Sequence, residues 1–246
     1  MFDFTGQTAI VTGGTRGIGR SISEGFLKAG GRVVATYASN DAAASQFRQE
    51  NSACADRIDI QKCDVSDYSD VEKLFEYLEK NYDGFEVLVN NAGIRKDAVL
   101  AMMKESEWHE VLETNLTGVF YMCKLAVQSL MRKRYGRIVN ITSPSGKYGF
   151  EGQANYAAAK AGMVALTRSL SKEVARRGIT VNCVSPGFIA TELIEDLPKE
   201  QRDAYTAQVP VKRFGKPEEV AACVLFLASK EASYVNGATL EVTGGL

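Results

Sequence analysis

The sequence predicts an α/β fold: a single domain over residues 1–246, built on a doubly wound parallel sheet of about seven strands with helices on both faces. Apolar runs of strand length alternate with helix-length amphipathic segments along the whole chain, which is typical of βαβ units. Runs such as Val87-Leu88-Val89 are apolar at every position, as strands covered on both faces are. No linker-like tract or internal repeat interrupts the pattern, and 246 residues suit one α/β unit.

The expected elements are justified one by one by the periodicity of their apolar residues. Short runs rich in β-branched residues predict strands, and longer segments with apolar residues at helical spacing predict helices. The expected strands are Thr8–Val11, Arg32–Thr36, Ile58–Gln61, Val87–Val89, Arg137–Ile141, Thr180–Val184 and Thr239–Val242. The expected helices are Ile18–Ala29, Ala42–Glu50, Tyr68–Tyr82, Glu105–Arg134, Tyr156–Arg177 and Pro217–Ala228.

One segment departs from this alternation. Residues 188–215 are polar and charged, and they separate the sixth expected strand from the last expected helix. A long excursion in a compact domain is typically a binding loop, so we expect a substrate-binding loop or lid here. A plain surface insertion is the alternative.

Composition excludes several classes of function. A net charge of −1 gives no overall field for holding nucleic acid or an anionic membrane. The five cysteines are odd in number and form no C-x-x-C pair, which favours reduced thiols in a cytoplasmic protein. The single histidine, His109, argues against a histidine-based metal site, and we expect it to cap or pack its helix. No secretory signal is visible, and the longest apolar run, Ala221–Ala228, is too short to cross a bilayer.

A glycine-rich loop follows the first expected strand. Its glycines, Gly13, Gly17 and Gly19, are spaced G-x-x-x-G-x-G and open the first helix. Glycine allows a sharp turn and close approach of a phosphate, and the helix N-terminus offers free N–H groups and partial positive charge. The loop therefore predicts pyrophosphate binding on a Rossmann-type sheet. A tight turn that only packs helix on sheet is the alternative.

The end of the second expected strand indicates which dinucleotide fits. Sites for NAD place an acidic residue there, on the ribose hydroxyls. Residues 35–39, which include Ala38 and Ser39, contain no carboxylate, whereas Arg16 in the glycine loop offers a guanidinium to a ribose phosphate. These residues favour NADP over NAD. Asn40-Asp41 comes later and is interpreted as a helix cap.

A serine, a tyrosine and a lysine form the candidate reaction site. Tyr156 and Lys160 are four residues apart, on one face of an expected helix. A cation at about 4 Å contributes about 4 kcal/mol at an effective dielectric near 20. That interaction would lower a phenol pKa of about 10 by up to roughly three units. Such a phenol serves as a general acid, and Ser143, at the end of the fifth strand, can bind the same substrate oxygen.

Taken together, these landmarks resemble the short-chain dehydrogenase/reductase family over essentially the whole chain. The resemblance also includes Asn182. It implies a catalytic tetrad of Asn115, Ser143, Tyr156 and Lys160, with Tyr156 as acid and base, Lys160 also on the nicotinamide ribose, and Asn115 holding a water of a proton relay. The cofactor residues that it and the loop argument imply are Gly13, Thr15, Arg16, Gly17, Ile18, Gly19, Ala38, Ser39, Asp64, Val65, Asn91, Ala92, Gly93, Tyr156, Lys160, Pro186, Gly187, Ile189 and Thr191.

Within the family the chain is most similar to the β-ketoacyl-[acyl-carrier-protein] reductases. The similar stretches include 88–94, 113–119, 152–162, 178–188 and 237–245. The resemblance implies NADPH-dependent reduction of a carrier-bound β-ketoacyl thioester in fatty acid or polyketide-type chain elongation. Arg134 and Arg177 match two arginines that dock the acidic carrier protein; two solvated helix-end arginines are the alternative. Pro144, Lys147 and Phe150-Glu151 depart from the subgroup and leave the acyl chain open.

Relatives are usually homotetramers that pair two long helices, expected here at Glu105–Arg134 and Tyr156–Arg177. Small residues such as Ala157 and Ala161 would allow close packing there, or would only pack on their own sheet. Two other functions stay open. One is NADP(H)-dependent oxidoreduction of acetoacetyl-CoA or another small carbonyl or alcohol. The other, more remote, is a non-catalytic nucleotide-binding scaffold, against which the presence of Tyr156 and Lys160 argues.

Overall fold

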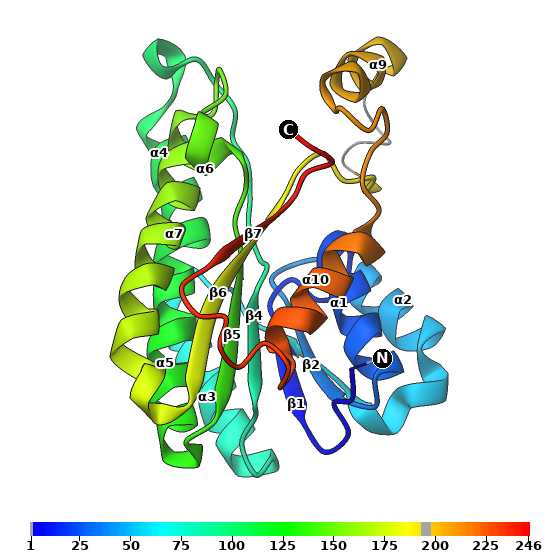
Figure 1. Cartoon of the computed structure of the whole chain (residues 1–246), viewed down its shortest axis with the longest axis vertical. Coiled ribbons are helices and arrows are strands. Elements are labelled where there is room, and N and C mark those ends of the chain that lie inside the picture. Colours follow the sequence, from blue (N-terminus) through cyan, green and yellow to red (C-terminus); the bar gives the residue numbers. More distant parts are fainter. Residues whose placement is uncertain (1, 193–197) are drawn as a thin grey trace.

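The chain folds around one twisted sheet with helices on both faces (Figure 1). The computed structural model describes residues 2–192 and 198–246. The seven strands of the described residues lie in the order β3-β2-β1-β4-β5-β6-β7, and every neighbouring pair is parallel. The predicted doubly wound sheet is therefore confirmed. The strands are β1 (Thr8–Val11), β2 (Arg32–Tyr37), β3 (Ile58–Lys62), β4 (Val87–Asn90), β5 (Gly136–Ile141), β6 (Ile179–Pro186) and β7 (Thr239–Val242).

The helices agree with the predicted ones except between residues 105 and 134 and in two added helices. The α-helices are α1 (Gly17–Lys28), α2 (Asp41–Glu50), α3 (Tyr68–Asn81), α4 (Glu105–Leu112), α5 (Gly118–Lys133), α6 (Ser145–Tyr148), α7 (Ala154–Val174), α9 (Lys199–Gln208) and α10 (Pro217–Ala228). Short 3-10 or π turns are η1 (Ser52–Arg57), η2 (Leu100–Met102), η3 (Glu113–Thr117) and η4 (Ala175–Arg177).

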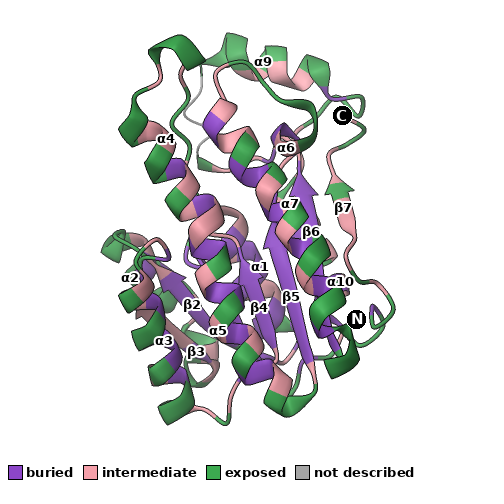
Figure 2. Cartoon of the chain, turned by 90° about the vertical axis from the view of Figure 1, so that its left-hand side faces the viewer, coloured by how far each residue is buried: buried purple, intermediate pink, exposed green. Residues whose placement is uncertain are grey.

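Two apolar cores, one on each face of the sheet, hold the layers together. On one face α1, α2 and α10 bury residues such as Phe26, Phe47 and Val224. On the other face α3, α5 and α7 bury residues such as Leu78, Met122 and Met163. Burial of both faces explains why β1, β4, β5 and β6 are buried at every position (Figure 2).

The strand order reverses between β1 and β4, which are neighbours in the sheet although two strands separate them in the chain. In doubly wound sheets, ligands bind outside the carboxyl ends of the strands at such a switch point. The glycine-rich loop after β1 and the loops after β4 and β5 all leave the sheet at this end. The fold therefore brings the predicted site residues toward one edge.

Two of the predicted elements need correction. The expected helix 105–134 is α4 and α5 joined by the π turn η3, and the expected lid, 188–215, contains the helix α9. Residues 193–197 of that lid lie outside the described residues. In the part of the chain that is described, no helix is long and apolar enough to cross a membrane.

Candidate active site

Ser143 lies just beyond the carboxyl end of β5, as predicted. The strand ends at Ile141, and the Thr142 amide still donates to Val184 O of β6, at 2.8 Å. The Ser143 hydroxyl interacts with both polar groups of Ser145: the two Oγ atoms are 3.3 Å apart, and the Ser145 amide donates to Ser143 Oγ at 3.2 Å. The half-buried hydroxyl is thus oriented at the first turn after the strand.

Tyr156 and Lys160 lie in the first turns of α7. The start of this helix is fixed by Asn155, which is fully buried and whose amide donates to Lys96 O and Glu107 O at 3.0 and 3.2 Å. Lys160 Nζ lies 5.6 Å from the centre of the Tyr156 ring and donates to Ile141 O at 2.7 Å. The lysine therefore joins α7 to the end of β5.

Asn115 lies in the π turn η3, between α4 and α5. Its side chain is fully buried and makes two hydrogen bonds with the backbone of Ile94: Nδ2 donates to the carbonyl and Oδ1 accepts from the amide, both at 2.8 Å. A Cβ atom on Gly93 would lie 3.0 Å from Asn115 Oδ1 and 3.8 Å from Lys160 Nζ. The four residues of the predicted tetrad are thus grouped around the ends of β4 and β5.

The electrostatics of the tyrosine differ from the sequence expectation. Burial raises the pKa of Tyr156, although the nearby Arg95 guanidinium and the Ser143 hydroxyl act to lower it. Burial also lowers the pKa of Lys160 to about 8, because the buried ammonium has a carbonyl acceptor but no carboxylate beside it among the described residues. The expectation that Lys160 brings the phenol pKa toward neutrality is therefore wrong for the protein by itself, in which desolvation outweighs nearby charge.

The predicted glycine loop leads from β1 into α1. Arg16 is the N-cap residue, and within the described chain no side chain caps the helix and its first turn contains no acidic residue. The site edge of α1 therefore presents uncapped N–H groups and partial positive charge, which suit a pyrophosphate. Gly19 is required for packing, because a Cβ atom there would lie 2.1 Å from Gly13 O. Thr15 is buried beside these glycines, and Ile18 is half-buried.

A strand-to-strand clamp holds this loop, and sequence reasoning missed its centre, Thr12. The Thr12 hydroxyl accepts from the amides of Asn91 and Ala92, each at 3.0 Å. The Asn91 side chain donates to Thr12 O and Gly13 O at 3.0 and 3.2 Å. The loops after β1 and β4 are thus fastened to each other, and the strand-end threonine one residue before Gly13 was the available signal.

The end of β2 has no free carboxylate among the described residues. Ala38 and Ser39 are exposed, and Asn40 caps α2 by accepting from the Ala43 amide at 2.9 Å, as predicted. The carboxylate of Asp41 is engaged by the Tyr37 hydroxyl, at 2.9 Å, and by Lys62 Nζ, at 3.6 Å.

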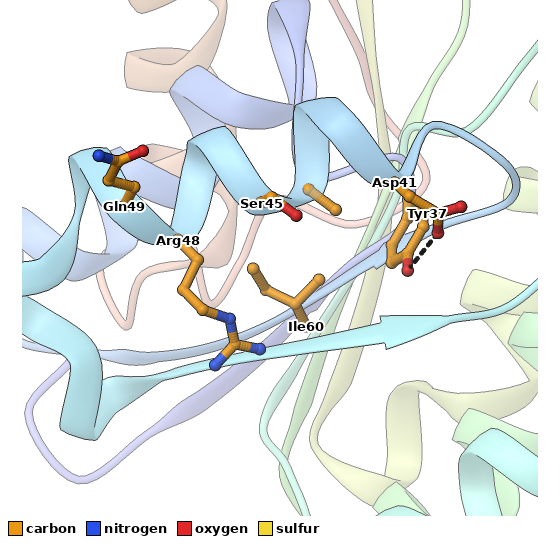
Figure 3. A pocket seen from close by; sticks show the side chains of 7 residues that line it. Tyr37, Asp41, Ser45, Arg48, Gln49 and Ile60 are labelled. Atoms are coloured by element: carbon orange, nitrogen blue, oxygen red, sulfur yellow. Dashed lines mark hydrogen bonds between the residues drawn. The ribbon is translucent and has the colours of Figure 1, made fainter.

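Figure 3 shows a hollow beside this strand end, under α2 and against β3, lined by Tyr37, Asp41, Ala44, Ser45, Arg48, Gln49 and Ile60. β3 is the edge strand of the sheet, and three strands separate it from β5 and Ser143. The hollow is therefore remote from the reaction site.

The remaining predicted cofactor residues lie at the ends of β3 and β6. Asp64 is exposed and accepts from Ser66 N and Oγ, while Val65 is buried. Pro186 ends β6, and the Gly187 amide donates to Val242 O at 3.0 Å. Ile189 is buried. Thr191 is near the glycine loop, since its Cγ2 would be 3.8 Å from a Cβ atom on Gly17.

The lid packs on its own aromatic residues. Phe188 stacks on Tyr205 of α9, with ring centroids 4.7 Å apart and planes 20° apart, and it meets Phe214 edge-on at 6.5 Å. In Figure 2, α9 lies beyond the carboxyl ends of the strands, at the end where the site is. Most of the exposed large apolar side chains lie in this lid or in the loops after β4 and β5, namely Val99, Leu100, Met102, Tyr148, Phe150 and Val211.

The two arginines proposed for docking lie at the opposite end of the sheet. Arg134 is the left-handed C-cap residue of α5, just before β5, and Arg177 ends η4, just before β6. Both are exposed. They are neighbours in space, since a Cβ atom on Gly178 would lie 2.6 Å from Arg134 O. The remaining prominent residue, His109, is exposed on α4, and in the described chain no cluster of possible metal ligands includes it.

Comparison with known proteins agrees with this arrangement. The family model described as "Enoyl-(Acyl carrier protein) reductase" matches residues 13–246. The chain is 44% identical over 241 residues to the 3-oxoacyl-[acyl-carrier-protein] reductase FabG of Vibrio cholerae, covering 98% of this chain and 97% of that protein. It is 43% identical over 248 aligned residues to the enzyme of the same name from Escherichia coli, covering 99% and 98%. It is 42% identical over 246 residues to nodulation protein G of a Rhizobium species, covering 100% and 99%.

Proposed function

Because the chain belongs to the short-chain dehydrogenase/reductase family, we propose that it reduces the 3-keto group of a β-ketoacyl thioester, carried by an acyl carrier protein, to the 3-hydroxyacyl thioester. It is an oxidoreductase of C=O and CH–OH groups that uses a nicotinamide cofactor. Relatives named for 3-oxoacyl reduction, similar over nearly their whole length, support the thioester substrate. The observation that carries the proposal is the grouping of Ser143, Tyr156, Lys160 and Asn115 beside an uncapped helix N-terminus that suits a dinucleotide.

The proposed roles of the side chains follow from their chemistry. When bound, the nicotinamide supplies the hydride that the ketone carbon receives. Tyr156 donates its phenolic proton to the oxygen that becomes the hydroxyl, so one hydride and one proton convert C=O to CH–OH. Ser143 donates a hydrogen bond to the same oxygen as its negative charge develops. Lys160 holds a proton close to Tyr156, and Asn115 fixes the backbone of Ile94 and orders a water of the relay.

We propose NADPH as the reductant. The only carboxylate close behind the end of β2 in the described chain, that of Asp41, is engaged by Tyr37 and Lys62, so ribose hydroxyls find no free acid there. Arg16 is exposed at the N-cap of α1. A guanidinium at this place suits a ribose phosphate, because it presents planar donors to phosphate oxygens.

The first test is the consumption of NADPH and of NADH with a β-ketoacyl thioester such as acetoacetyl-CoA. NADPH oxidation at least about tenfold faster than NADH oxidation supports both the reaction and the role of Arg16, because a charged pairing contributes about 1.5–3 kcal/mol. A 2-enoyl thioester of the same length should not be reduced. Faster reduction of the enoyl thioester would replace ketone reduction by double-bond reduction, and preference for NADH would contradict the NADPH proposal.

The carrier and the homotetramer belong to one proposal. Arg134 and Arg177 lie at the amino ends of β5 and β6, whereas Ser143 and Tyr156 lie at the opposite end. The separation along α7 is roughly 30 Å, at 1.5 Å per helical residue. A carrier bound at these arginines therefore serves the site of a neighbouring subunit better than its own. Exposed small residues on α7, Ala158 and Ala161, and the exposed Phe120 of α5 support a subunit contact along these helices.

Charge reversal tests this docking site. Arg134→Glu should raise the KM for a carrier-bound β-ketoacyl thioester about tenfold and leave the CoA thioester unaffected, because only the carrier is acidic over a large surface. An equal change with both substrates would contradict docking. A cytoplasmic location belongs to the same proposal and is supported by the five cysteines, all of which are free thiols.

A further inference from the structure

Arg95 is a charged residue close to the reaction site that the proposed mechanism does not use. It lies in the loop after β4, directly after the Asn91–Ile94 stretch that faces the cofactor site. Its Cζ atom is 5.8 Å from the centre of the Tyr156 ring. This distance is almost the same as the 5.6 Å between Lys160 Nζ and that ring. Tyr156 therefore lies close to two cations: Lys160, which is buried, and Arg95, whose side chain is 41% exposed.

A chain of hydrogen bonds holds the guanidinium in place. Asp97 pairs with it through Oδ1 to Nε, at 3.3 Å, and through Oδ2 to Nη2. Asp97 Oδ2 also accepts from Gln153 Nε2 at 3.2 Å, and Gln153 Oε1 accepts from Ser145 Oγ at 2.8 Å. Ser145 in turn touches Ser143. This chain joins the loops after β4 and β5 to the start of α7, so the orientation of Arg95 is coupled to that of Ser143.

One edge of the guanidinium is left for a ligand. Asp97 occupies Nε and Nη2, and in the described residues Nη1 has no acceptor. The charge of Arg95 also acts on the lid, because Tyr156 and Tyr205 of α9 both help to raise the pKa of Arg95, against its burial. Arg95 thus lies between the proposed acid and the lid helix, where a substrate passes from the lid to the phenol.

We propose that Arg95 is a substrate-binding residue whose free Nη1 edge donates a hydrogen bond to the thioester carbonyl oxygen of the β-ketoacyl substrate. The inference rests on the proposed function. A β-ketoacyl thioester has two carbonyl oxygens separated by one methylene group, so a substrate whose ketone oxygen meets Tyr156 and Ser143 carries its second oxygen nearby. A planar cation held in a fixed orientation binds that oxygen and selects 1,3-dicarbonyl compounds over isolated ketones.

An exposed arginine–aspartate pair on a loop is the competing interpretation. Such pairs contribute little by themselves, about 0–1 kcal/mol in general. A pair of that kind would leave the choice of substrate unaffected, whereas a substrate-binding arginine would not. The two interpretations therefore differ in selectivity rather than in overall activity.

The test compares two substrates that differ only in the proposed acceptor. One is a β-ketoacyl pantetheine thioester, and the other is its thioether analogue, in which CH₂ replaces the thioester carbonyl and the ketone is kept. For Arg95→Gln we expect the ratio of kcat/KM, thioester over thioether, to fall about 10- to 100-fold, mainly through the KM of the thioester, because a hydrogen bond to a charged donor is lost. Arg95→Lys should restore part of the ratio. The matched control is Lys96→Gln, which removes the same charge from the next residue, where Lys96 Nζ pairs with Glu110 at 3.3 Å.

The outcomes separate this inference from the proposed function. A ratio that Arg95→Gln leaves unchanged, or that Lys96→Gln lowers equally, overturns the role of Arg95 while ketone reduction stands. A wild-type protein that reduces the thioether but not the thioester overturns the proposed function, and the inference with it. Circular dichroism and NADPH titration of each variant check that the fold and the cofactor site are intact.

Discussion

At the start of α1 the proposed nucleotide site is made of backbone, whereas at the ends of β4 and β5 the proposed substrate site is made of side chains. The glycine loop is fixed by contacts that leave no room for a Cβ atom at Gly19, and by the Thr12–Asn91 hydrogen bonds between neighbouring strand ends. The substrate end depends on Tyr156, Ser143 and Arg95, which come from separate elements.

The two regions also differ in their exposure. The strand ends below the glycine loop are buried at every position, but the loops after β4 and β5 carry exposed apolar residues such as Leu100 and Phe150. A backbone site presents the same donors whatever the surrounding side chains are, so it suits a common cofactor. A side-chain site on loops can change its substrate without altering the sheet. The difference teaches that binding and chemistry should be separable by mutation in this molecule.

The largest effect should come from removing the proposed acid. Tyr156→Phe should lower kcat with a β-ketoacyl thioester by about 10³-fold, because proton donation by a positioned side chain contributes roughly 10²–10⁴-fold. NADPH binding should stay within about twofold of the wild type, since the phenol hydroxyl is not part of the backbone site. Steady-state kinetics and fluorescence titration of NADPH measure the two quantities.

Two results would break the comparison. Unchanged turnover in Tyr156→Phe would mean that another group donates the proton. A large loss of NADPH affinity along with kcat would mean that the nucleotide and substrate regions are not separable.

The next effect concerns the backbone site and compares two glycines of the same helix. In Gly19→Ala the new methyl group would lie 2.1 Å from Gly13 O and 2.5 Å from Asn91 Nδ2, and neither neighbour can withdraw without moving the loop. In Gly25→Ala the methyl group would meet only the flexible Leu225 side chain, at 3.1 Å. Alanine favours a helix over glycine by about 1 kcal/mol, so only the contacts distinguish the two variants.

We expect Gly19→Ala to lose about 3 kcal/mol of unfolding free energy or more, with a loss of NADPH affinity, because overpacking against backbone cannot relax. Gly25→Ala should stay within about 1 kcal/mol of the wild type, since helix propensity offsets the tighter contact. Urea unfolding and NADPH titration give both values. Equal stability of the two variants would show that the loop is softer than its contacts indicate.

The same contrast explains what the sequence predicts and what it does not. All seven strands, the glycine loop and the Tyr156–Lys160 spacing follow from periodicity and local motifs. The π turn at Glu113–Thr117 does not, because the apolar pattern of α4 continues into α5 and hides one extra residue in a turn.

The interactions around Tyr156 are also beyond local pattern. Arg95 and Tyr156 are 61 positions apart in the chain, and nothing in either segment indicates that the guanidinium approaches the ring. The direction of the Tyr156 pKa depends on burial by the whole fold, which spacing within α7 cannot reveal. Side-chain sites built from several loops are therefore located by sequence but not characterised by it.

Lys160 lies where the two regions meet, and it provides the smallest and most specific test. Burial lowers its pKa from the usual 10.5 to about 8, although Nζ donates to Ile141 O at 2.7 Å. The unfolded chain therefore holds the proton more tightly than the folded protein between pH 8 and 10.5. Because the state that binds more protons loses stability as pH rises, this group makes the folded protein relatively more stable as pH increases through that window.

Lys160→Met removes this dependence while keeping an unbranched side chain. The unfolding free energy of Lys160→Met minus that of the wild type should therefore fall by roughly 1–3 kcal/mol from pH 7 to pH 10.5, since one pKa unit corresponds to about 1.4 kcal/mol. Lys172→Met, at an exposed position of the same helix, should show a difference that does not change with pH. Urea unfolding at several pH values measures both. A flat difference for Lys160→Met would mean that water reaches the ammonium and that its charge is not desolvated. In that case the cation beside Tyr156 is solvated, and the separation between a buried proton-holding residue and an exposed substrate-binding arginine would have to be abandoned.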